Sequence, residues 1–244
     1  MVPRALAILS LSLPVVLPAC AARPVPWRGA TPQTWPVLRR ALANERAARP
    51  VSPWTAGVRV AVRDPGSGQV VRGRGGMAIA PGRALRMILV GVAGVTMFDA
   101  WVTPESWRVA VPPLGIVRRG GAGEPDDVPV GFLRWWLCRP MSGTLFAATF
   151  DGESPIWLLR DGGAVVEVRA DRCDRGPRLR VSRRTAARAE SIEECAAGSR
   201  ASVGDRVRYR DETSGLAMDL TLESVSGEPP PAEAFRDPDA AGEP

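Results

Sequence analysis

The sequence of 244 residues contains no histidine and no lysine, and it has a single tyrosine. The absence of histidine removes the usual general base of enzymes and a common metal ligand. The four cysteines show no spacing typical of a metal site. We therefore expect no enzymatic activity, no metal ion and no cofactor.

Three short patterns that could suggest catalysis or phosphate binding are incomplete. The adjacent acids Asp126 and Asp127 lie in a polar segment, where a solvated turn explains them. The tetrapeptide at 152–155, G-E-S-P, lacks the final glycine of a nucleophile elbow. The glycine-rich stretch 72–76 opens no helix, so it does not predict a phosphate site.

The chain lacks a long apolar run except at its start, where Arg4 precedes an apolar stretch from Ala5 to Ala19. Prolines interrupt this stretch, and it is too short to predict a membrane span. The pattern is typical of a secretory signal, and we assign residues 1–19 to a signal peptide.

The signal ends in Leu17-Pro18-Ala19-Cys20, which resembles the lipobox of bacterial lipoproteins. That resemblance implies cleavage before Cys20, acylation of its thiol and amino group, and anchoring of the chain by buried lipid. The alternative is an ordinary cleaved signal in which Cys20 has no role. Ala21 after the cysteine is compatible with sorting to the outer membrane.

All 32 basic residues are arginines, and the net charge is +6. The last segment, 228–244, carries five acids against Arg236, so the preceding body is more basic than the chain average. A basic body with an acidic tail could face anionic head groups, although arginines alternating along strands are also typical of a solvated face. Export argues against a nucleic-acid partner.

If Cys20 is acylated, three cysteines remain, which allows at most one disulfide in an oxidising compartment. Cys173 and Cys195 lie in polar surroundings and are the candidate pair. Cys138 lies in an apolar stretch and is expected as a small buried hydrophobe.

Hydrophobic periodicity predicts a helix over 33–48, with Thr34 as a candidate N-cap, and a largely antiparallel set of strands. We expect segment 112–128 to be a loop and segment 183–198 to have helical character. The strands are predicted at 57–63, 69–79, 84–90, 95–101, 106–111, 155–160, 164–170, 178–182, 206–210 and 216–225.

The segment 128–140 is the most apolar stretch after the signal and ends at Pro140. We expect a short helix there that is apolar nearly all round and therefore packs on an apolar surface.

These elements predict a mainly β (α+β) fold. We expect an incomplete, strongly curved antiparallel β-barrel of about 10–11 strands, with short α-helices capping a hydrophobic cavity. The expected organisation is a Pro/Arg-rich tether at 20–32, one domain at 33–227 and a disordered acidic tail at 228–244.

Two segments resemble the LolA/LolB family of lipoprotein-localisation proteins. Residues 85–109, L-R-M-I-L-V-G-V-A-G-V-T-M-F-D-A-W-V-T-P-E-S-W-R-V, are similar to the family's core strands. Residues 127–140 match the Pro-x-x-x-Leu-Arg-x-Trp pattern of the helix that follows in LolB, and 216–225 fits the last strand. The resemblance covers most of 34–225.

The resemblance implies an incomplete barrel with a helical lid over a cavity that receives acyl chains. The expected cavity lining comes from the sheet and from the lid, although the same residues could also fill a solid core. It comprises Met87, Leu89, Phe98, Trp107, Met218 and Leu220 from the sheet, with Phe132, Trp135, Trp136 and Leu137 from the lid.

The sequence departs from LolB in one turn. Where LolB has an exposed leucine in a Pro-Leu-Gly context, this chain has Val92-Ala93-Gly94. Ala93 takes the place of the leucine, and a methyl group buries much less apolar area. If that leucine drives membrane delivery in the family, this chain has either lost the contact at this turn, Val92 and Ala93 included, or relies on Val92 for it.

Two functional hypotheses follow. In the first, the chain is a monomeric, lipid-anchored protein of the outer membrane, facing the periplasm of a Gram-negative bacterium. It binds acyl chains of lipoproteins or lipids, and exchanges them with a periplasmic carrier. In the second, it is a structural lipoprotein of an envelope complex, which contacts a partner through Arg206, Arg208 and Arg210 or through the acidic tail.

Overall fold

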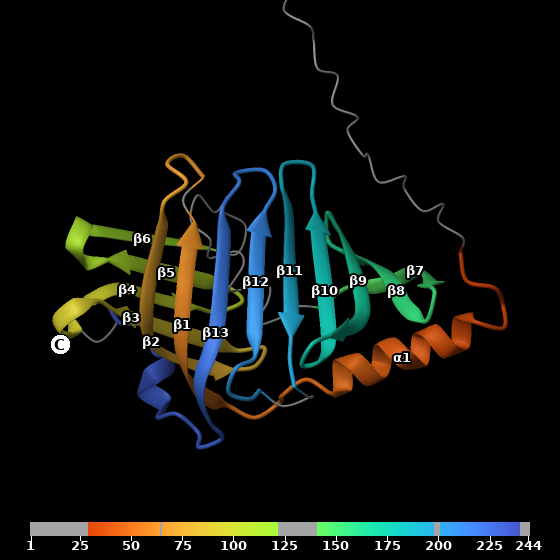
Figure 1. Cartoon of the computed structure of the whole chain (residues 1–244), viewed down its shortest axis with the longest axis horizontal. Helices are drawn as coiled ribbons and strands as arrows, with labels where there is room; N and C mark the ends of the chain where they lie inside the picture. Colours follow the sequence, from red (N-terminus) through yellow and green to blue (C-terminus); the bar gives the residue numbers. More distant parts are fainter. Residues whose placement is uncertain (1–28, 64, 122–140, 198–200, 240–244) are drawn as a thin grey trace, which may run out of the picture.

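A single antiparallel sheet of thirteen strands organises the described part of the chain. The computed structural model describes residues 29–63, 65–121, 141–197 and 201–239. The strand order is β6-β5-β4-β3-β2-β1-β13-β12-β11-β10-β9-β8-β7, so each half of the chain forms a meander. Figure 1 shows the two halves meeting at β1 and β13.

The first half of the sheet consists of β1 (Trp54–Arg63), β2 (Val70–Ala80), β3 (Ala84–Val90), β4 (Thr96–Val102), β5 (Ser106–Val111) and β6 (Ile116–Gly121). The second half consists of β7 (Thr144–Asp151), β8 (Ser154–Asp161), β9 (Ala164–Cys173), β10 (Gly176–Arg184), β11 (Ala189–Cys195), β12 (Arg206–Asp211) and β13 (Ala217–Ser226).

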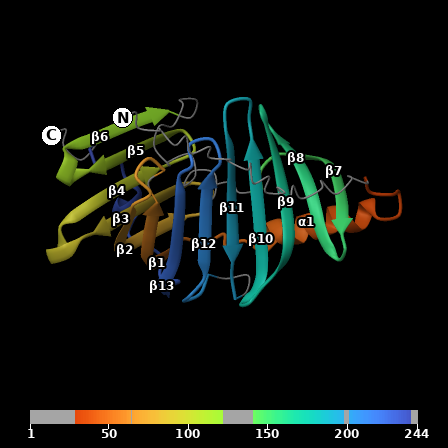
Figure 2. The same ribbon diagram turned by 45° about the horizontal axis from the view of Figure 1, so that its top comes forward.

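The sheet is curved and does not close, as predicted from the sequence. Figures 1 and 2 show that β3–β6 run across the direction of β1, β13 and β12, so the sheet bends strongly between its halves. The ends of the strand order, β6 and β7, are not paired with each other. The expected incomplete barrel is confirmed, with thirteen strands in place of about 10–11.

Three of the thirteen strands were not predicted. Strand β6 lies within the segment expected as a loop, and β7 lies in a stretch that received no assignment. The prediction of helical character at 183–198 is wrong, because β10 extends to Arg184 and β11 occupies Ala189–Cys195. Strand β11 contains three glutamates, but it pairs with β10 on one side and β12 on the other, which overrides its local helix propensity.

Gly57 lies at an irregularity in the junction between the halves. β1 pairs with β13 along its length, with a register shift at Gly57 and Val58. The Gly57 amide donates to Ser224 Oγ at 3.0 Å, and a Cβ at position 57 would lie 2.5 Å from that oxygen. A side chain at position 57 would therefore displace the Ser224 hydroxyl and break this hydrogen bond between the two strands.

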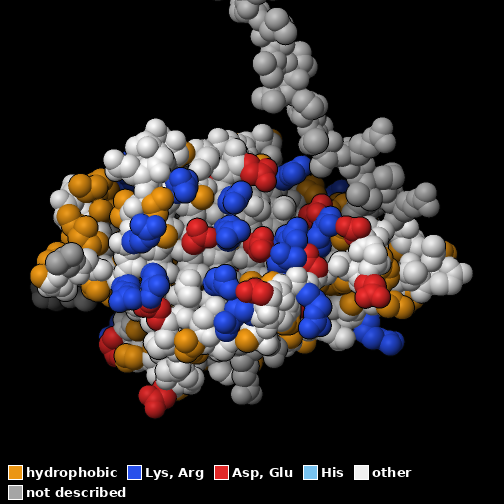
Figure 3. All heavy atoms as spheres, viewed as in Figure 1, with side chains coloured by type: hydrophobic (Ala, Val, Ile, Leu, Met, Phe, Trp, Pro, Cys, Tyr) orange, Lys and Arg blue, Asp and Glu red, His pale blue; other side chains and the backbone are white. Residues whose placement is uncertain are grey.

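One face of the sheet, which we call the inner face, holds the core. β13 shows the alternation clearly, since Met218, Leu220 and Leu222 are buried while Asp219 is exposed. The buried residues of both halves form one hydrophobic cluster. The opposite, outer face carries most of the charged side chains, which dominate the view in Figure 3.

Helix α1 (Trp35–Ala47) packs on the inner face at β7 and β8. Its apolar stripe buries Leu38 and Leu42, as the helical spacing predicts. The buried Trp157 indole on β8 donates from Nε1 to the Leu38 carbonyl at 2.8 Å. Arg46 in the last turn donates to the Met141 and Gly143 carbonyls, which ties the helix to the segment before β7.

Thr34 occupies the N-cap position of α1, but its side chain does not cap the helix. Its hydroxyl donates instead to the Thr31 carbonyl at 3.2 Å and accepts from the Thr31 amide at 2.9 Å. The prediction of Thr34 as N-cap is therefore right for the position and wrong for the hydrogen bond. Pro36 supplies the fixed φ that favours the first turn.

Residues 228–239, which we call the C-terminal strap, lie against the outer face of the first half. They include the 3-10 helix η4 (Ala232–Phe235), which contacts β2 and β3. The Trp101 indole donates to the Phe235 carbonyl at 2.8 Å, and Arg108 Nε donates to Asp239 Oδ2 at 2.9 Å. The expected disorder is therefore wrong for this part of the acidic segment, since acidic residues find arginine partners on the sheet.

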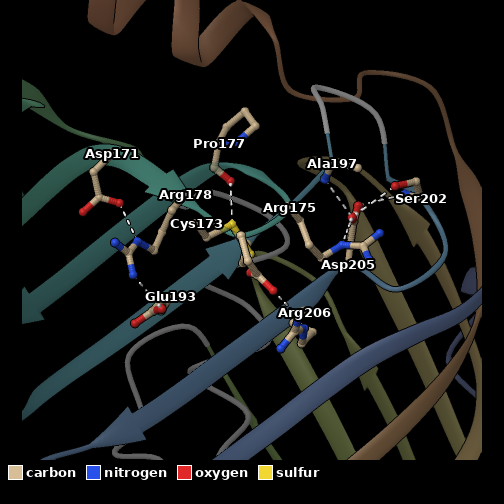
Figure 4. Close-up of a disulfide and its surroundings, with 12 residues drawn as sticks. Asp171, Cys173, Arg175, Pro177, Arg178, Glu193, Ala197, Ser202, Asp205 and Arg206 are labelled. Carbon is tan, nitrogen blue, oxygen red and sulfur yellow. Dashed lines mark hydrogen bonds and ion pairs between the residues drawn. A yellow bond between two sulfur atoms is a disulfide. The ribbon is translucent and has the colours of Figure 1, made fainter.

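A disulfide joins Cys173 at the end of β9 to Cys195 at the end of β11. This is the pair that the sequence favours. It crosses the start of β10, whose Arg178 pairs with Asp171 on β9 and Glu193 on β11 (Figure 4). The disulfide and the ion pairs hold three neighbouring strands together at one end of the sheet.

We predict that Trp157→Phe lowers the free energy of unfolding by about 1–3 kcal/mol, because the Leu38 carbonyl loses its buried donor and a small void forms. Urea denaturation followed by circular dichroism measures the change. Trp101→Phe, which removes an indole donor on the outer face, should have a smaller effect. Equal midpoints for wild-type and Trp157→Phe protein would contradict this role.

The strap should loosen in acid. Hydrogen bonds from Arg119, and for Asp239 first from Arg108, lower the pKa of Asp237 and Asp239 below the ordinary aspartate value. Because the pKa of each carboxyl group is lower in the folded state, its ion pairs stabilise the strap at pH values above the ordinary aspartate pKa. This stabilisation is lost as the pH falls through the folded-state pKa. Hydrogen exchange in 228–239 should therefore accelerate below about pH 4 relative to β13.

Arg119→Gln should accelerate exchange in the strap even at neutral pH, because Arg119 pairs with both Asp237 and Asp239. Arg236→Gln is the matched control, since Arg236 makes only an exposed contact with Glu233 at 3.8 Å. Equal exchange in these two variants would show that the ion pairs do not hold the strap.

Candidate functional site

The six sheet residues expected to line a cavity lie on the inner face. Met87 and Leu89 come from β3, and the antiparallel register sets Leu89 beside Phe98 of β4. Met87, Trp107, Met218 and Leu220 are buried in the core cluster, and Leu89 and Phe98 are half-buried against it. The structure therefore brings these residues together on one apolar surface.

The other predicted site residues lie outside the described ranges. They are Cys20 and the four lid residues Phe132, Trp135, Trp136 and Leu137. Their roles stay predictions.

Methionine and small residues occupy the middle of the inner face in the first half. One row across the strands contains Ala56, Met77, Met87, Ala100 and Val109, which face one another in the register. Methionine is unbranched and polarizable, so it adapts its shape to a neighbouring apolar group. Such a row can accommodate a flexible hydrocarbon chain more easily than a row of rigid aromatic rings.

Three tryptophans of the described chain are buried on the sheet, and they differ in hydrogen bonding. The Trp157 and Trp101 indoles each donate to a main-chain carbonyl. The Trp107 indole on β5 is 5% exposed, and its Nε1 has no acceptor among the described residues. Sequence reasoning treated Trp107 as apolar lining and did not identify this donor, because hydrogen-bond satisfaction depends on which atoms the fold brings near it.

The predicted membrane-contact turn is well defined. It joins β3 to β4 through the 3-10 turn η1 (Val92–Gly94) and is closed by a hydrogen bond from the Gly91 amide to the Val95 carbonyl at 2.9 Å. Ala93 has a φ of 63° and is exposed. A positive φ is unfavourable for a non-glycine residue, so the backbone at Ala93 is strained.

A second turn extends this apolar surface. The 3-10 turn η2 (Pro112–Leu114) joins β5 to β6 and contacts β4, so it lies at the same end of the sheet as η1. We call the exposed hydrophobic residues in the two turns and in the strand ends beside them the apolar tip. Figure 3 shows hydrophobic side chains gathered at this end, at the left of the view. The tip comprises Val90, Val95, Met97, Leu114, Ile116 and Val117.

Sequence reasoning found the η1 turn and missed η2. The sequence predicts one loop over residues 112–128. That prediction includes neither the strand that begins at Ile116 nor the turn that exposes Leu114. Ile116 and Val117 are two consecutive apolar residues, which is too short a pattern to identify a strand by itself.

The outer face is mostly a network of paired charges. Arg208 pairs with Asp219 at 3.0 Å, and Arg206 pairs with Asp174 at 3.0 Å. The hydrogen bond from Arg208 to Asp219 raises the pKa of that arginine. The alternating arginines of β12 therefore behave largely as a solvated, paired surface.

A polar groove of about 380 Å³ lies on this face beside the disulfide (Figure 4). Its lining includes Arg178, Arg206 and Glu193, which already have charged partners. The groove does not suit an apolar ligand. Cys173, Asp174 and Cys195 lie close enough to resemble a metal site, but the two sulfur atoms are bonded to each other and supply no thiolate.

A buried polar cluster lies at the opposite end of β11 and β12. The Tyr209 hydroxyl donates to Glu190 at 3.2 Å, and Arg188 pairs with Asp211 at 3.0 Å. Burial and the nearby Glu190 charge raise the pKa of Tyr209, so the phenol stays protonated. Burial opposes ionisation of Asp211, but hydrogen bonds from Ser214 and Thr213 and the Arg188 charge outweigh it and lower its pKa.

This cluster has a structural explanation. Each charged group has a partner of opposite sign or a hydrogen-bond donor, as buried charges require.

None of the helices in the described ranges has the length and apolar composition needed to cross a membrane.

The comparisons with known proteins identify the fold. No family model and no curated protein matches the sequence. A LolA superfamily protein from Nitrosomonas europaea superposes with a TM-score of 0.55 at 11% identity, covering 82% of this chain and 97% of its own. A domain described as outer membrane lipoprotein-sorting, from Vibrio parahaemolyticus, superposes with a TM-score of 0.51 at 10% identity, covering 82% and 95%.

Both matches extend over nearly the whole length of the solved structures. The chain has a LolA/LolB-like fold.

Proposed function

We propose that this chain is a membrane-anchored lipoprotein that binds acyl chains on its inner face and serves the localisation of lipids or lipoproteins in the bacterial envelope. The observation that carries the proposal is the continuous apolar inner face of an open sheet, with methionine and small residues in its middle row. Binding sites for apolar ligands are mostly apolar with few polar groups, and this surface has that composition.

The structural neighbours support the class of function. Their printed descriptions refer to the LolA superfamily and to outer membrane lipoprotein sorting. A carrier of acyl chains needs binding and release and no bond chemistry, which agrees with the absence of histidine from the whole sequence. We therefore propose a non-enzymatic role.

Anchoring is proposed from the N-terminal sequence. Acylation of Cys20 after cleavage of residues 1–19 would hold the domain on the outer membrane, facing the periplasm. Phe132, Trp135, Trp136 and Leu137 are proposed to form the lid that shields bound acyl chains from water. Both assignments rest on sequence patterns and on the resemblance to LolB.

The apolar tip is proposed as the place where the domain touches a bilayer. Leu114 is 70% exposed and Val95 is 55% exposed, and they belong to the two turns at one end of the sheet. Full burial of one leucine is favourable by about 1.5–3 kcal/mol, so several such side chains can hold this end at a membrane surface. The β5–β6 turn would then compensate for the small side chain at Ala93.

The alternative is a structural lipoprotein of an envelope complex. The observation that favours it is the charged outer face, where Arg210 has no carboxylate within 4 Å among the described residues although Arg206 and Arg208 are paired. Crosslinking in intact envelopes distinguishes the two functions, because a scaffold would yield one stoichiometric partner and a carrier would yield many unrelated lipoproteins.

We predict that the purified full chain binds a fluorescent fatty-acyl probe, and that Leu89→Asp weakens binding at least about tenfold, because a carboxylate on the inner face must be desolvated. Val165→Asp is the matched control, since Val165 is 44% exposed and lies on β9 away from the core cluster. Probe fluorescence titrations measure both variants. Absence of binding by wild-type protein would refute the carrier function.

Trp136→Asp tests the lid. We expect weaker binding of the same probe, because the proposed lid would lose apolar area and gain a charge next to the acyl chain. Wild-type affinity in this variant would contradict the lid assignment and leave the inner face as the whole site.

The apolar tip gives a third expectation. Adding vesicles of phosphatidylethanolamine and phosphatidylglycerol should slow hydrogen exchange at 90–97 and 112–117. Leu114→Asp should remove this protection, because a charged side chain opposes insertion. Val203→Asp, at another exposed loop position, should retain it. Protection that persists in Leu114→Asp would show that the tip does not enter the bilayer.

A further inference from the structure

The Trp107 indole is a hydrogen-bond donor placed in the apolar interior. Its side chain is 5% exposed, and Nε1 has no acceptor among the described residues. Buried tryptophan N–H groups usually find a partner, since an unpaired donor loses its hydrogen bonds to water without replacement. An unpaired donor in a native interior therefore calls for an explanation.

Trp107 differs in its hydrogen bonding from the other buried tryptophans of the described chain. Trp157 donates to the Leu38 carbonyl and Trp101 donates to the Phe235 carbonyl, both at 2.8 Å. These two indoles hold helix α1 and the C-terminal strap on the sheet. Trp107 holds no such element through its N–H, although it is as well buried as they are.

The neighbours of Trp107 in the sheet cannot accept its hydrogen bond through their side chains. In the register, Trp107 faces Val102 on β4 and Gly120 on β6. The next residue in this row, Leu85 on β3, is also apolar. Nothing polar on these side chains competes for the indole N–H, so an acceptor that enters the inner face would find it unoccupied.

Trp107 lies near the end of the inner face that is remote from the apolar tip. β5 runs from Ser106 near the β4–β5 turn to Val111 beside η2. The four-residue separation from Trp107 to Val111 spans about 13 Å along the strand. This distance is comparable to the length of about ten methylene groups, so an acyl chain lying along β5 can reach from the tip to the indole.

We propose that Trp107 Nε1 donates a hydrogen bond to the carbonyl oxygen of an acyl ester or acyl amide bound on the inner face. The proposal rests on the proposed acyl-chain binding and specifies the ligand further. The apolar row holds the hydrocarbon, and the indole selects chains that carry a carbonyl at one end. A plain hydrocarbon leaves the donor unpaired and gains nothing from it.

Three probes of equal chain length test the selection with the purified full chain. Dodecane has no acceptor, methyl decanoate has an ester carbonyl as in a glycerolipid, and N-methyldecanamide has an amide carbonyl as in an acylated protein. We expect Trp107→Phe to weaken binding of the ester or the amide roughly tenfold and to leave dodecane unchanged. The probe that loses more affinity identifies the source of the acyl chain.

Trp101→Phe is the matched control, because it makes the same exchange on the outer face, where the indole already has a partner. It should leave the binding of all three probes unchanged. If Trp107→Phe does not fold, benzothienylalanine at position 107 keeps the shape of the ring and replaces its N–H by sulfur, and it should give the same loss.

The indole resonance supplies a second measurement. In protein labelled with ¹⁵N-tryptophan, the Trp107 N–H signal should move downfield on addition of methyl decanoate or N-methyldecanamide and should move little with dodecane. A signal that already has a hydrogen-bonded shift in the free protein, and does not respond to any probe, would overturn the proposal.

The outcomes separate this inference from the proposed function. If wild-type protein binds no probe, acyl-chain binding fails and the role of Trp107 fails with it. If wild-type and Trp107→Phe protein bind all three probes with equal affinity, acyl-chain binding stands and the donor role of Trp107 is refuted.

Discussion

The pairing of β1 with β13 is the constraint on which the rest of the structure depends. These two strands come from opposite ends of the described chain, and their contact makes one sheet from two meanders. At the junction, the Gly57 amide donates to the Ser224 hydroxyl. The core cluster contains residues of both meanders, so this pairing joins their apolar faces into one. The continuous inner face is therefore a product of a long-range contact.

Two layers protect the sheet in different ways. On the inner face, α1 covers β7 and β8 and is held by a buried hydrogen bond from Trp157. On the outer face, the C-terminal strap covers part of β2–β5 and is held by ion pairs that reach from Asp99 through Arg108 to Asp239. The helix depends on apolar burial, which charge screening does not weaken, whereas the strap depends on partly exposed charges, which salt and acid weaken.

The open form of the sheet links the fold to the proposed function. A closed small barrel fills its interior with its own side chains, whereas an open, curved sheet has an apolar face that other groups must cover. The two ends of that face differ in character. One end has the apolar tip with Leu114 and Val95, and the other has the Trp107 donor, which has no acceptor among the described residues. This asymmetry would orient the acyl chain that we propose as the ligand, since its polar end and its hydrocarbon end would meet different surroundings.

The sequence by itself determined the class of fold, and it indicated six residues of the inner face and the candidate disulfide pair. Alternation along 216–225 and the polar surroundings of Cys173 and Cys195 carry that information locally. Only the tertiary structure decided that Cys173 and Cys195 are bonded, that 189–195 is a strand and that the acidic segment 228–239 lies on the sheet. It also decided that Leu114 adjoins the η1 turn and that Trp107 Nε1 has no acceptor among the described residues. Each of these features depends on which residues distant in the sequence become neighbours in space. Local periodicity does not contain this information, because strand pairing depends on how the whole sheet buries its apolar face.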